Sequence, residues 1–408
     1  MFAINSYCNQ ELPPKPFLTT YVLLIAMKIL AKYCLILLIE VLFIGNSGVA
    51  QSNTLPGILG NEKAYAVTER ALDHIYNVEI DEADPLIAQL DQMLPNYPAI
   101  PMLRAIAVRA QHYPLEPDSE AFEQMKDYLY EVIDQAEEVL DEDEDHIEAN
   151  FFMLSAYGLL ALYENEDGNY FKAVGQAKSA YSYLKKGFEL KDEYPDFYFS
   201  SGLYNYYREK YPELHPFYNS FMWFFRDGDK ALGLAQMDRA FHEALFLRSE
   251  AADYLTHIYL FYENQPEKAL SYAQALVDRY PDNLYFVMNY THAALAAGQF
   301  VDTEAYAQRL IDSDQRYYRV AGNLFRGMLL EKRDQRWEEA EEAYLRSLKF
   351  NVGIDGEAAE NYRSYAYAGL ARIADHQQKP AQAKALYEKA LDSAQYPPVI
   401  QEAEAYLQ

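Results

Sequence analysis

The chain has 408 residues, a length that favours several domains or one stacked array over a single core. Half of its residues are hydrophobic and 24% are charged, which is typical of a folded protein and excludes a largely disordered one. With 62 acidic against 35 basic residues the formal net charge is -27, so binding to nucleic acid is not expected because phosphates would be repelled across most of the surface.

The N-terminal residues have the composition of a secretory signal peptide. From Met27 the chain carries two lysines, an apolar run at residues 33–44 and small residues that end at Ala50. We therefore expect translation to start at Met27, cleavage before Gln51, and a mature chain that is periplasmic or otherwise exported across the inner membrane. The alternative is an uncleaved anchor, because residues 17–44 are long enough to span a bilayer, although charged side chains interrupt them.

Cysteine usage agrees with this interpretation. Both cysteines, Cys8 and Cys34, precede the predicted cleavage position. The exported chain then has no thiol and no disulfide, which excludes thiol redox chemistry.

Helical periodicity runs through most of the mature chain, with proline or glycine at intervals that suit pairs of helices. The clearest unit is residues 250–283, in which two helices are expected to meet near Pro266. Its second helix places Ala269, Ala273 and Leu276 on one face, at spacings of four and three. Small residues at such positions allow neighbouring helices to approach closely.

The same pattern recurs at a spacing of 34 residues, with insertions between some units. In the later units the recurring positions are Thr303, Ala307 and Leu310, then Trp337, Ala340, Tyr344 and Ser347, and finally Ala383, Tyr387 and Ala390. Upstream the match is weaker, and the recurring positions are Ala71, Ala83, Ile87 and Leu90, then Gly202, and Ala231 and Ala235 after an insertion.

This array resembles the tetratricopeptide-repeat (TPR) family, whose repeat carries small or apolar residues at fixed places and often a closing proline. The resemblance implies an all-α protein, a right-handed α-solenoid of about eight TPR-like helix pairs. We expect residues 1–50 to be an extension and signal peptide, 51–247 to hold divergent pairs with insertions, and 248–408 to form a regular array. Each pair then packs only against its neighbours and leaves a concave groove, which implies binding and not a reaction.

Motifs for catalysis and for metals do not occur in the chain. There is no GxxxxGK[ST], no glycine-rich dinucleotide turn, no HExxH and no GxSxG. The 8 histidines are widely spaced, and the acidic run at residues 137–148 lacks the glycine and ligand spacing of a calcium loop, so we interpret it as a solvated connector. We therefore expect a non-enzymatic protein without a metal or a cofactor.

The family resemblance also implies which first-helix positions face the groove. In this chain they are Phe199, Leu203, Tyr206, Tyr254, Ile258, Phe261, Tyr285, Met288, His292, Leu295, Arg319, Arg326, Tyr365, Arg372 and Asp375. Among them we predict that the partner is bound by Tyr254, Tyr285, His292, Arg319, Arg326 and Arg372. Guanidinium groups pair bidentately with carboxylates, so the partner is expected to offer an acidic or C-terminal peptide. Alternatively, the arginines neutralise the protein's own acidic residues.

Aromatic residues make up 15% of the chain and are dense at residues 217–225, in an insertion that the repeat does not require. Phe221, Trp223 and Phe224 are further candidates for partner binding, as a docking surface or as a plug in the groove. The alternative is that aromatic side chains only fill gaps between helices.

We therefore predict a non-enzymatic TPR scaffold of the cell envelope that binds a protein or peptide partner in its groove and associates with envelope complexes. No integral membrane span is expected after signal cleavage. Two alternatives remain open at this stage. One is a secreted glycan-binding TPR-type protein with aromatic platforms, and the other is an α/α-toroid glycosidase or lyase, which needs two carboxylates about 5–10 Å apart.

Overall fold

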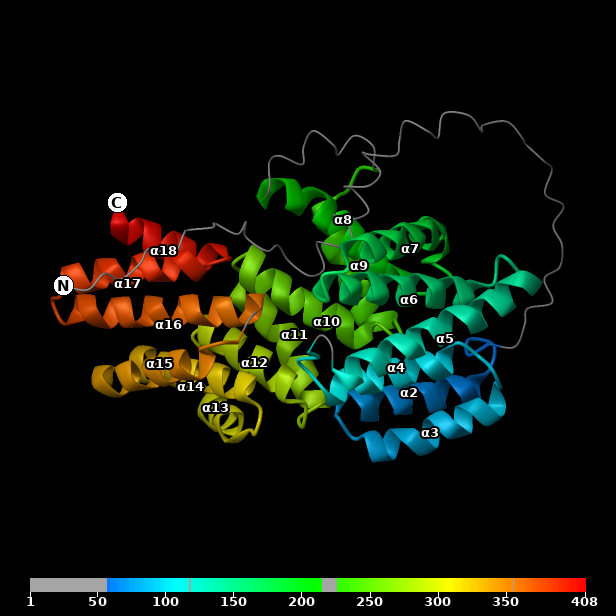
Figure 1. Cartoon of the computed structure of the whole chain (residues 1–408), viewed down its shortest axis with the longest axis horizontal. Helices are drawn as coiled ribbons and strands as arrows, with labels where there is room; N and C mark the ends of the chain where they lie inside the picture. Colours follow the sequence, from blue (N-terminus) through cyan, green and yellow to red (C-terminus); the bar gives the residue numbers. More distant parts are fainter. Residues whose placement is uncertain (1–56, 117–118, 215–225, 355) are drawn as a thin grey trace, which may run out of the picture.

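The computed structural model describes residues 57–116, 119–214, 226–354 and 356–408, and every regular element in these ranges is a helix (Figure 1). In chain order the helices are α2 (Glu62–Tyr76), α3 (Ile80–Met93), α4 (Ala99–Gln111), α5 (Glu120–Glu142), α6 (Ile147–Glu166), α7 (Tyr170–Leu190), α8 (Asp196–Leu214), α9 (Lys230–Glu243), α10 (Arg248–His257) with its π-helical continuation η2 (Ile258–Tyr262), α11 (Pro266–Arg279), α12 (Leu284–Ala296), α13 (Thr303–Asp312), α14 (Arg316–Lys332), α15 (Trp337–Asn351), α16 (Glu357–His376), α17 (Pro380–Ser393) and α18 (Pro397–Leu407).

Consecutive helices form sequential pairs from α2–α3 to α16–α17, and α18 packs on the last pair (Figure 1). Short turns connect the helices within most pairs, and short turns make neighbouring helices antiparallel. The turns of most pairs contain a residue at positive φ, a conformation that ends a helix and redirects the chain; these residues are Val78, Gly168, Asn264, Gly298, Asp302, Gln335 and Gln378. The structure confirms the predicted all-α, TPR-like solenoid of helix pairs.

Small residues set the spacing within and between pairs, as the repeat pattern predicts. Ala269 and Ala273 of α11 are completely buried, and Leu276 is nearly so. Pro266 occupies the first turn of α11, where its missing N–H has no intrahelical partner to lose. The corresponding positions Thr303, Ala307 and Leu310 of α13 are buried in the same way.

The packing register of α9 differs from the sequence prediction. Ala231 and Ala235, which we expected at the helix interface, are exposed, whereas Gly233, Met237 and Ala240 are buried. A Cβ atom added to Gly233 would lie 2.5 Å from the backbone nitrogen of Tyr206 in α8. The two backbones therefore touch at Gly233, and this contact fixes a register two residues away from the predicted one.

The first helix pair packs against helices that lie about 200 residues later in the sequence, and side-chain hydrogen bonds join them. Arg279 at the end of α11 donates two hydrogen bonds to the carboxylate of Asp73 in α2, at 2.8 and 2.9 Å. The Nδ2 atom of Asn283 donates to the carbonyl oxygen of Tyr76 at 2.8 Å. The N-terminal pairs are therefore closed by α10–α12 (Figure 1).

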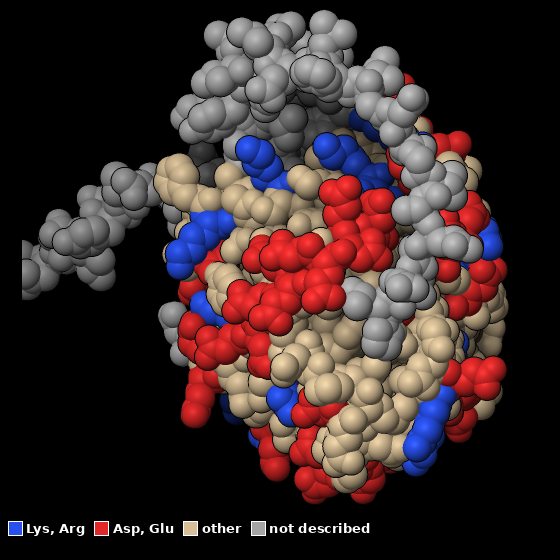
Figure 2. Space-filling view, turned by 90° about the vertical axis from the view of Figure 1, so that its right-hand side faces the viewer, with Lys and Arg blue, Asp and Glu red and all other residues tan. Residues whose placement is uncertain are grey.

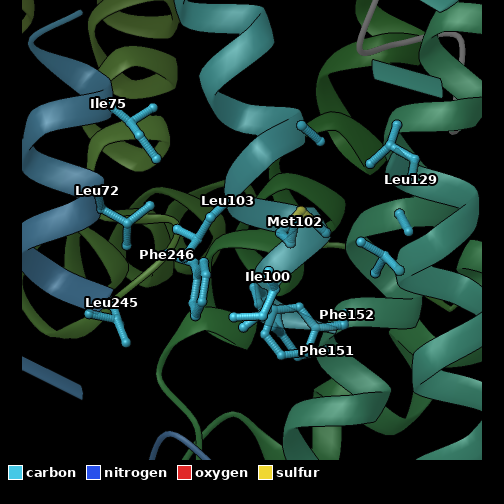
Figure 3. Close-up of a cluster of buried hydrophobic side chains, with 14 of the residues drawn as sticks. Leu72, Ile75, Ile100, Met102, Leu103, Leu129, Phe151, Phe152, Leu245 and Phe246 are labelled. Atoms are coloured by element: carbon cyan, nitrogen blue, oxygen red, sulfur yellow. The ribbon is translucent and has the colours of Figure 1, made fainter. Parts of the chain in front are cut away.

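The core of these N-terminal pairs is aromatic. The ring of Phe246, in the loop between α9 and α10, lies 5.7 Å from that of Phe151 and 5.2 Å from that of Phe152 in α6 (Figure 3). The loop is held by the buried carboxyl of Asp196, which accepts a hydrogen bond from the backbone N–H of Leu247 at 2.8 Å. Burial raises the pKa of this carboxyl to about 6.

Acidic side chains spread over the end of the molecule formed by the first helix pairs, with fewer basic side chains among them (Figure 2). The acidic run at residues 137–148 spans the end of α5, a short connection and the start of α6. Glu138 and Glu142 of α5 and Glu144 and Asp145 of the connection are exposed. Glu148 of α6 is buried and accepts hydrogen bonds from the chain before α2. The prediction of a solvated connector is therefore right only for residues 143–146, because the rest of the run is helical.

Candidate binding face

The first helices of the later pairs are buried on almost every side. In α14, Arg326 is the one exposed residue between Val320 and Glu331. Each such helix leaves only a narrow row of side chains open, and together these rows form a surface that we call the inner stripe. Its members are Tyr254, Phe261, Tyr285, Asn289, Arg319, Arg326, Tyr365 and Arg372, all partly or fully exposed.

Two segments far apart in the sequence pack on this surface. The ring of Tyr113, which follows α4, lies 4.3 Å from the ring of Tyr285. Tyr396, which precedes α18, stacks on Phe261 with ring centroids 4.6 Å apart. Such contacts are expected on the concave side of a curved array of helix pairs.

Tyr254 and Tyr285, two of the predicted partner-binding residues, are partly exposed on the inner stripe, and Tyr285 is held in place. The hydroxyl of Tyr285 donates to Oδ2 of Asp253 at 2.8 Å, and Nδ2 of Asn289 donates to Oδ1 of the same carboxylate at 2.8 Å. Burial and the neighbouring charge of Glu250 raise the pKa of Asp253 to about 7. The stripe therefore presents fixed aromatic rings beside a carboxyl that is partly protonated near neutral pH.

His292 does not lie on the stripe, contrary to the prediction. Its side chain is 2% exposed and is surrounded by aromatic rings, with Phe261 at 5.3 Å, Phe325 at 5.4 Å and Tyr365 at 5.0 Å between ring centroids. Among the described residues, its Nε2 atom has no hydrogen-bond partner. Burial lowers its pKa to about 3, so the ring is neutral at pH 7 and supports the stripe from behind.

Other predicted groove positions are buried for the same reason. Aromatic side chains fill the space that an open groove would leave, so the stripe is narrower than the family resemblance implies. The buried positions are Phe199, Tyr206, Ile258, Met288 and Leu295.

Of the three arginines, Arg372 is occupied by the protein itself. It donates through Nε and Nη2 to the two carboxylate oxygens of Glu331, at 2.5 and 2.8 Å, and through Nη1 to Glu402 at 2.7 Å. These carboxylates and the buried Tyr344 raise its pKa against the effect of its own burial. For Arg372 the structure therefore favours the alternative interpretation, in which arginine neutralises internal acidic residues.

Arg319 and Arg326 differ in how much of the guanidinium group remains available. Nε of Arg319 donates to the carbonyl oxygen of Ser313 at 2.6 Å, and its Nη2 lies 3.7 Å from Asp314. Arg326 makes no hydrogen bond or ion pair within the described ranges. It is the arginine of the stripe whose donors are all free for a partner.

Several predicted features lie outside the described residues, namely Phe221, Trp223, Phe224 and the signal peptide. Among the residues that the structure describes, no three His, Cys, Asp or Glu side chains group as metal ligands. In the same part of the chain, no helix is both long and apolar enough for a bilayer.

Sequence reasoning missed Tyr113, Asp253 and Tyr396 at this surface. Asp253 precedes a predicted groove residue directly, and its pairing with α12 could have been inferred from helix adjacency. Tyr113 and Tyr396 lie outside the repeat units, and nothing in the register points to them.

Comparisons with known proteins add little to this geometry. No protein-family model matches the chain, and no curated protein matches it. The crystal structure of the yeast protein Tom70 aligns with 86% of this chain and 90% of that chain, at 11% sequence identity and a TM-score of 0.34. The conclusion about the fold therefore depends on the helix pairs described above, and no functional conclusion is drawn from Tom70.

Proposed function

We propose that this chain is a non-enzymatic scaffold of the cell envelope that binds a protein or peptide partner along the inner stripe. The observation that carries the proposal is Arg326, a guanidinium group with no counter-ion among the described residues, in a protein of net charge -27. An arginine left unpaired among so many carboxylates is available to an external anion.

The chemistry of the stripe specifies the kind of partner. Arg326 offers a planar fork of donors that matches a carboxylate, from an acidic side chain or from a C-terminus. The rings of Phe261 and Tyr365 pack on His292 and offer apolar area on the same stripe. A short extended peptide with a carboxylate and flanking apolar side chains satisfies both features.

The overall charge predicts how such a partner approaches. An acidic peptide is repelled at long range, and salt screens that repulsion over a Debye length of about 8 Å at physiological ionic strength. We expect the association rate to rise with moderate salt, whereas the contact with Arg326 weakens only at higher salt. This dependence is opposite to that of a basic protein recruiting the same peptide.

The envelope location is supported by the order of charged, apolar and small residues at positions 27–50. N-terminal sequencing of the mature protein is expected to begin at or near Gln51. Recovery of the intact chain from the cytoplasm would contradict export, and an intact chain in the membrane would indicate an anchor.

The binding proposal is tested by photo-crosslinking followed by mutagenesis. A photo-reactive residue replacing Tyr365 on the stripe should capture the partner from solubilised envelopes, and the same residue replacing Leu345 on the outer side of α15 should not. Arg326→Ala should then weaken the affinity at least tenfold, since a hydrogen bond to a charged group contributes about 1.5–3 kcal/mol.

Arg346→Ala is the matched control, because Arg346 is an exposed arginine of α15 whose ion pair, within the described residues, is with Glu342 one turn away. Equal affinities of the Arg326→Ala and Arg346→Ala variants would refute the role of the stripe. Binding of a neutral oligosaccharide that survives Arg326→Ala would favour the glycan-binding alternative.

A further inference from the structure

An apolar cavity of about 220 Å³ lies among the N-terminal pairs and opens to solvent along part of α6, where Gly158 and Leu159 are partly exposed. Among residues of the inner stripe it touches only Tyr254. Apolar side chains of α4, α6, α7 and α8 form most of its wall, among them Met102, Phe151 and Leu159 (Figure 3 shows the first two). Cavities of about 150 Å³ with such a lining remain dry and bind benzene. This cavity is larger, so it has room for an apolar ligand.

The cavity is longer than a single amino-acid side chain of a protein partner. Residues of α6 from Phe151 to Leu162 line it, and at a rise of 1.5 Å per residue this stretch is about 16 Å long. A side chain inserted from the surface of another protein reaches only part of that length. A linear chain extends through it.

Two charged groups line the cavity, Arg109 and Glu250, and they pair with each other. Glu250 also accepts a hydrogen bond from the hydroxyl of Tyr76 at 3.2 Å. The other polar groups of the lining are uncharged hydroxyls of serine and tyrosine. Because the two charges compensate each other, the cavity offers no net charge to an ionised head group. The lining therefore selects an uncharged chain and leaves a charged head at the opening.

The sequence keeps this space open with small residues. A Cβ atom added to Gly158 in α6 would meet no atom within 4 Å, and the buried Ala105, Ala177 and Ala180 also line the cavity. An apolar ligand that fills the cavity removes its apolar lining from contact with water, which favours occupancy.

We propose that the cavity binds a single aliphatic hydrocarbon chain, such as the acyl chain of a free fatty acid or of an acylated peptide. This site is separate from Arg326, and the proposal does not depend on the partner bound by the inner stripe. The chain lies along α6 and packs against its apolar side chains, with its polar head near the opening.

The test uses the purified chain and the uncharged fluorophore 1-N-phenylnaphthylamine. The probe should bind saturably and should be displaced by dodecanol, by dodecanoate, or by a dodecanoylated peptide, but not by the same peptide without its acyl group. Displacement by dodecanoate indicates free fatty acid as the source of the chain. Displacement by the acylated peptide alone indicates a lipid-modified protein.

A graded series of substitutions locates the bound probe. Gly158→Ala, Gly158→Val and Gly158→Leu should progressively weaken its affinity, by at least tenfold for Gly158→Leu, with unchanged circular dichroism. Gly175→Leu is the control, because Gly175 is exposed on α7 and an added Cβ atom there also meets nothing within 4 Å.

Three results would overturn the proposal: no saturable binding, equal affinity in the folded members of the Gly158 series, or displacement by unacylated apolar peptides alone. The last result would assign the cavity to a side chain of a protein partner. Affinity for the partner of the stripe should be the same in Gly158→Leu and in the unmodified chain, so failure of one proposal is distinguishable from failure of the other.

Discussion

A substitution of Arg372 tests whether this arginine stabilises the fold or is available to bind a partner. It donates two hydrogen bonds to Glu331, whose side chain is 6% exposed and whose remaining partner is the hydroxyl of Tyr344 at 2.5 Å. Arg372→Ala removes both bonds and the counter-charge together. The carboxylate of Glu331 then stays buried with a single donor.

The burial of the ion pair between Arg372 and Glu331 sets the expected loss of stability. Removing one partner of a fully buried ion pair costs about 3–5 kcal/mol, most of it from the charge left behind. The side chains of Arg372 and Glu402 are 27% and 35% exposed, so water reaches part of the network. We therefore expect Arg372→Ala to lower the free energy of unfolding by about 2–4 kcal/mol. Arg326→Ala, at an exposed arginine without a partner among the described residues, should change it by less than about 0.5 kcal/mol.

The assay is urea denaturation monitored by circular dichroism, with the slope of each transition compared to detect a change of mechanism. The double variant Arg372→Ala, Glu331→Gln should recover more than about 1 kcal/mol of the loss, because the buried charge is gone. Equal stability of Arg372→Ala and Arg326→Ala would refute the structural role. Arg372 would then return to the set of partner-binding candidates.

Three further outcomes follow from the packing and the electrostatics. Gly233→Ala should lower the free energy of unfolding by about 1–3 kcal/mol, because α8 and α9 must separate to admit one methyl group. Thermal denaturation measures this loss, with Ala235→Ser as the control at an exposed position of the same helix. Asp253 has a pKa of about 7 in the folded chain against 3.8 in the unfolded chain, so its contribution to stability is complete below about pH 4 and is lost as the pH rises through 7. The free energy of unfolding of Asp253→Asn should therefore rise relative to that of the unmodified chain over this range. A difference between the two that does not change with pH would contradict this reasoning. Asn283→Asp keeps the side-chain oxygen that caps α12 but loses the donor to Tyr76, so hydrogen exchange should accelerate in α2 and α3 and remain unchanged in α16 and α17.

The array was predictable because its packing positions repeat. The small residues at Ala269 and Ala273 recur at a fixed spacing and are completely buried, and α11 packs mainly on the neighbouring helices α10 and α12, so local pattern and tertiary packing coincide. The prediction failed in α9, where an insertion interrupts the spacing and the contact depends on Gly233 instead of an alanine. A repeat pattern cannot locate a backbone contact that only one pair makes.

The repeat register predicted which side chains are exposed at only some positions of the candidate surface, since His292 and Met288 are buried. The repeat register places Tyr254, Tyr285 and Arg326 on the open row of their helices, as the structure does. It does not show that Arg372 is taken by Glu331, 41 residues away, or that aromatic rings bury His292. Those outcomes depend on which side chains of different pairs meet, which the register of one pair does not encode.

Closure of the N-terminal pairs explains why one array offers two kinds of surface. Asp73 and Tyr76 of the first pair are bonded to Arg279 at the end of α11 and Asn283 before α12, so the early pairs curve around a common inner side. This inner side holds the apolar cavity that Gly158 lines. On the later pairs, Tyr113 and Tyr396 pack on part of the inner stripe, at Tyr285 and Phe261, and Arg326 stays exposed. Helix pairs of the same kind would therefore bind an apolar chain in the early part of the array and a charged peptide in the later part. The contacts of Asp73 and Tyr76 determine which pairs curve around the apolar cavity.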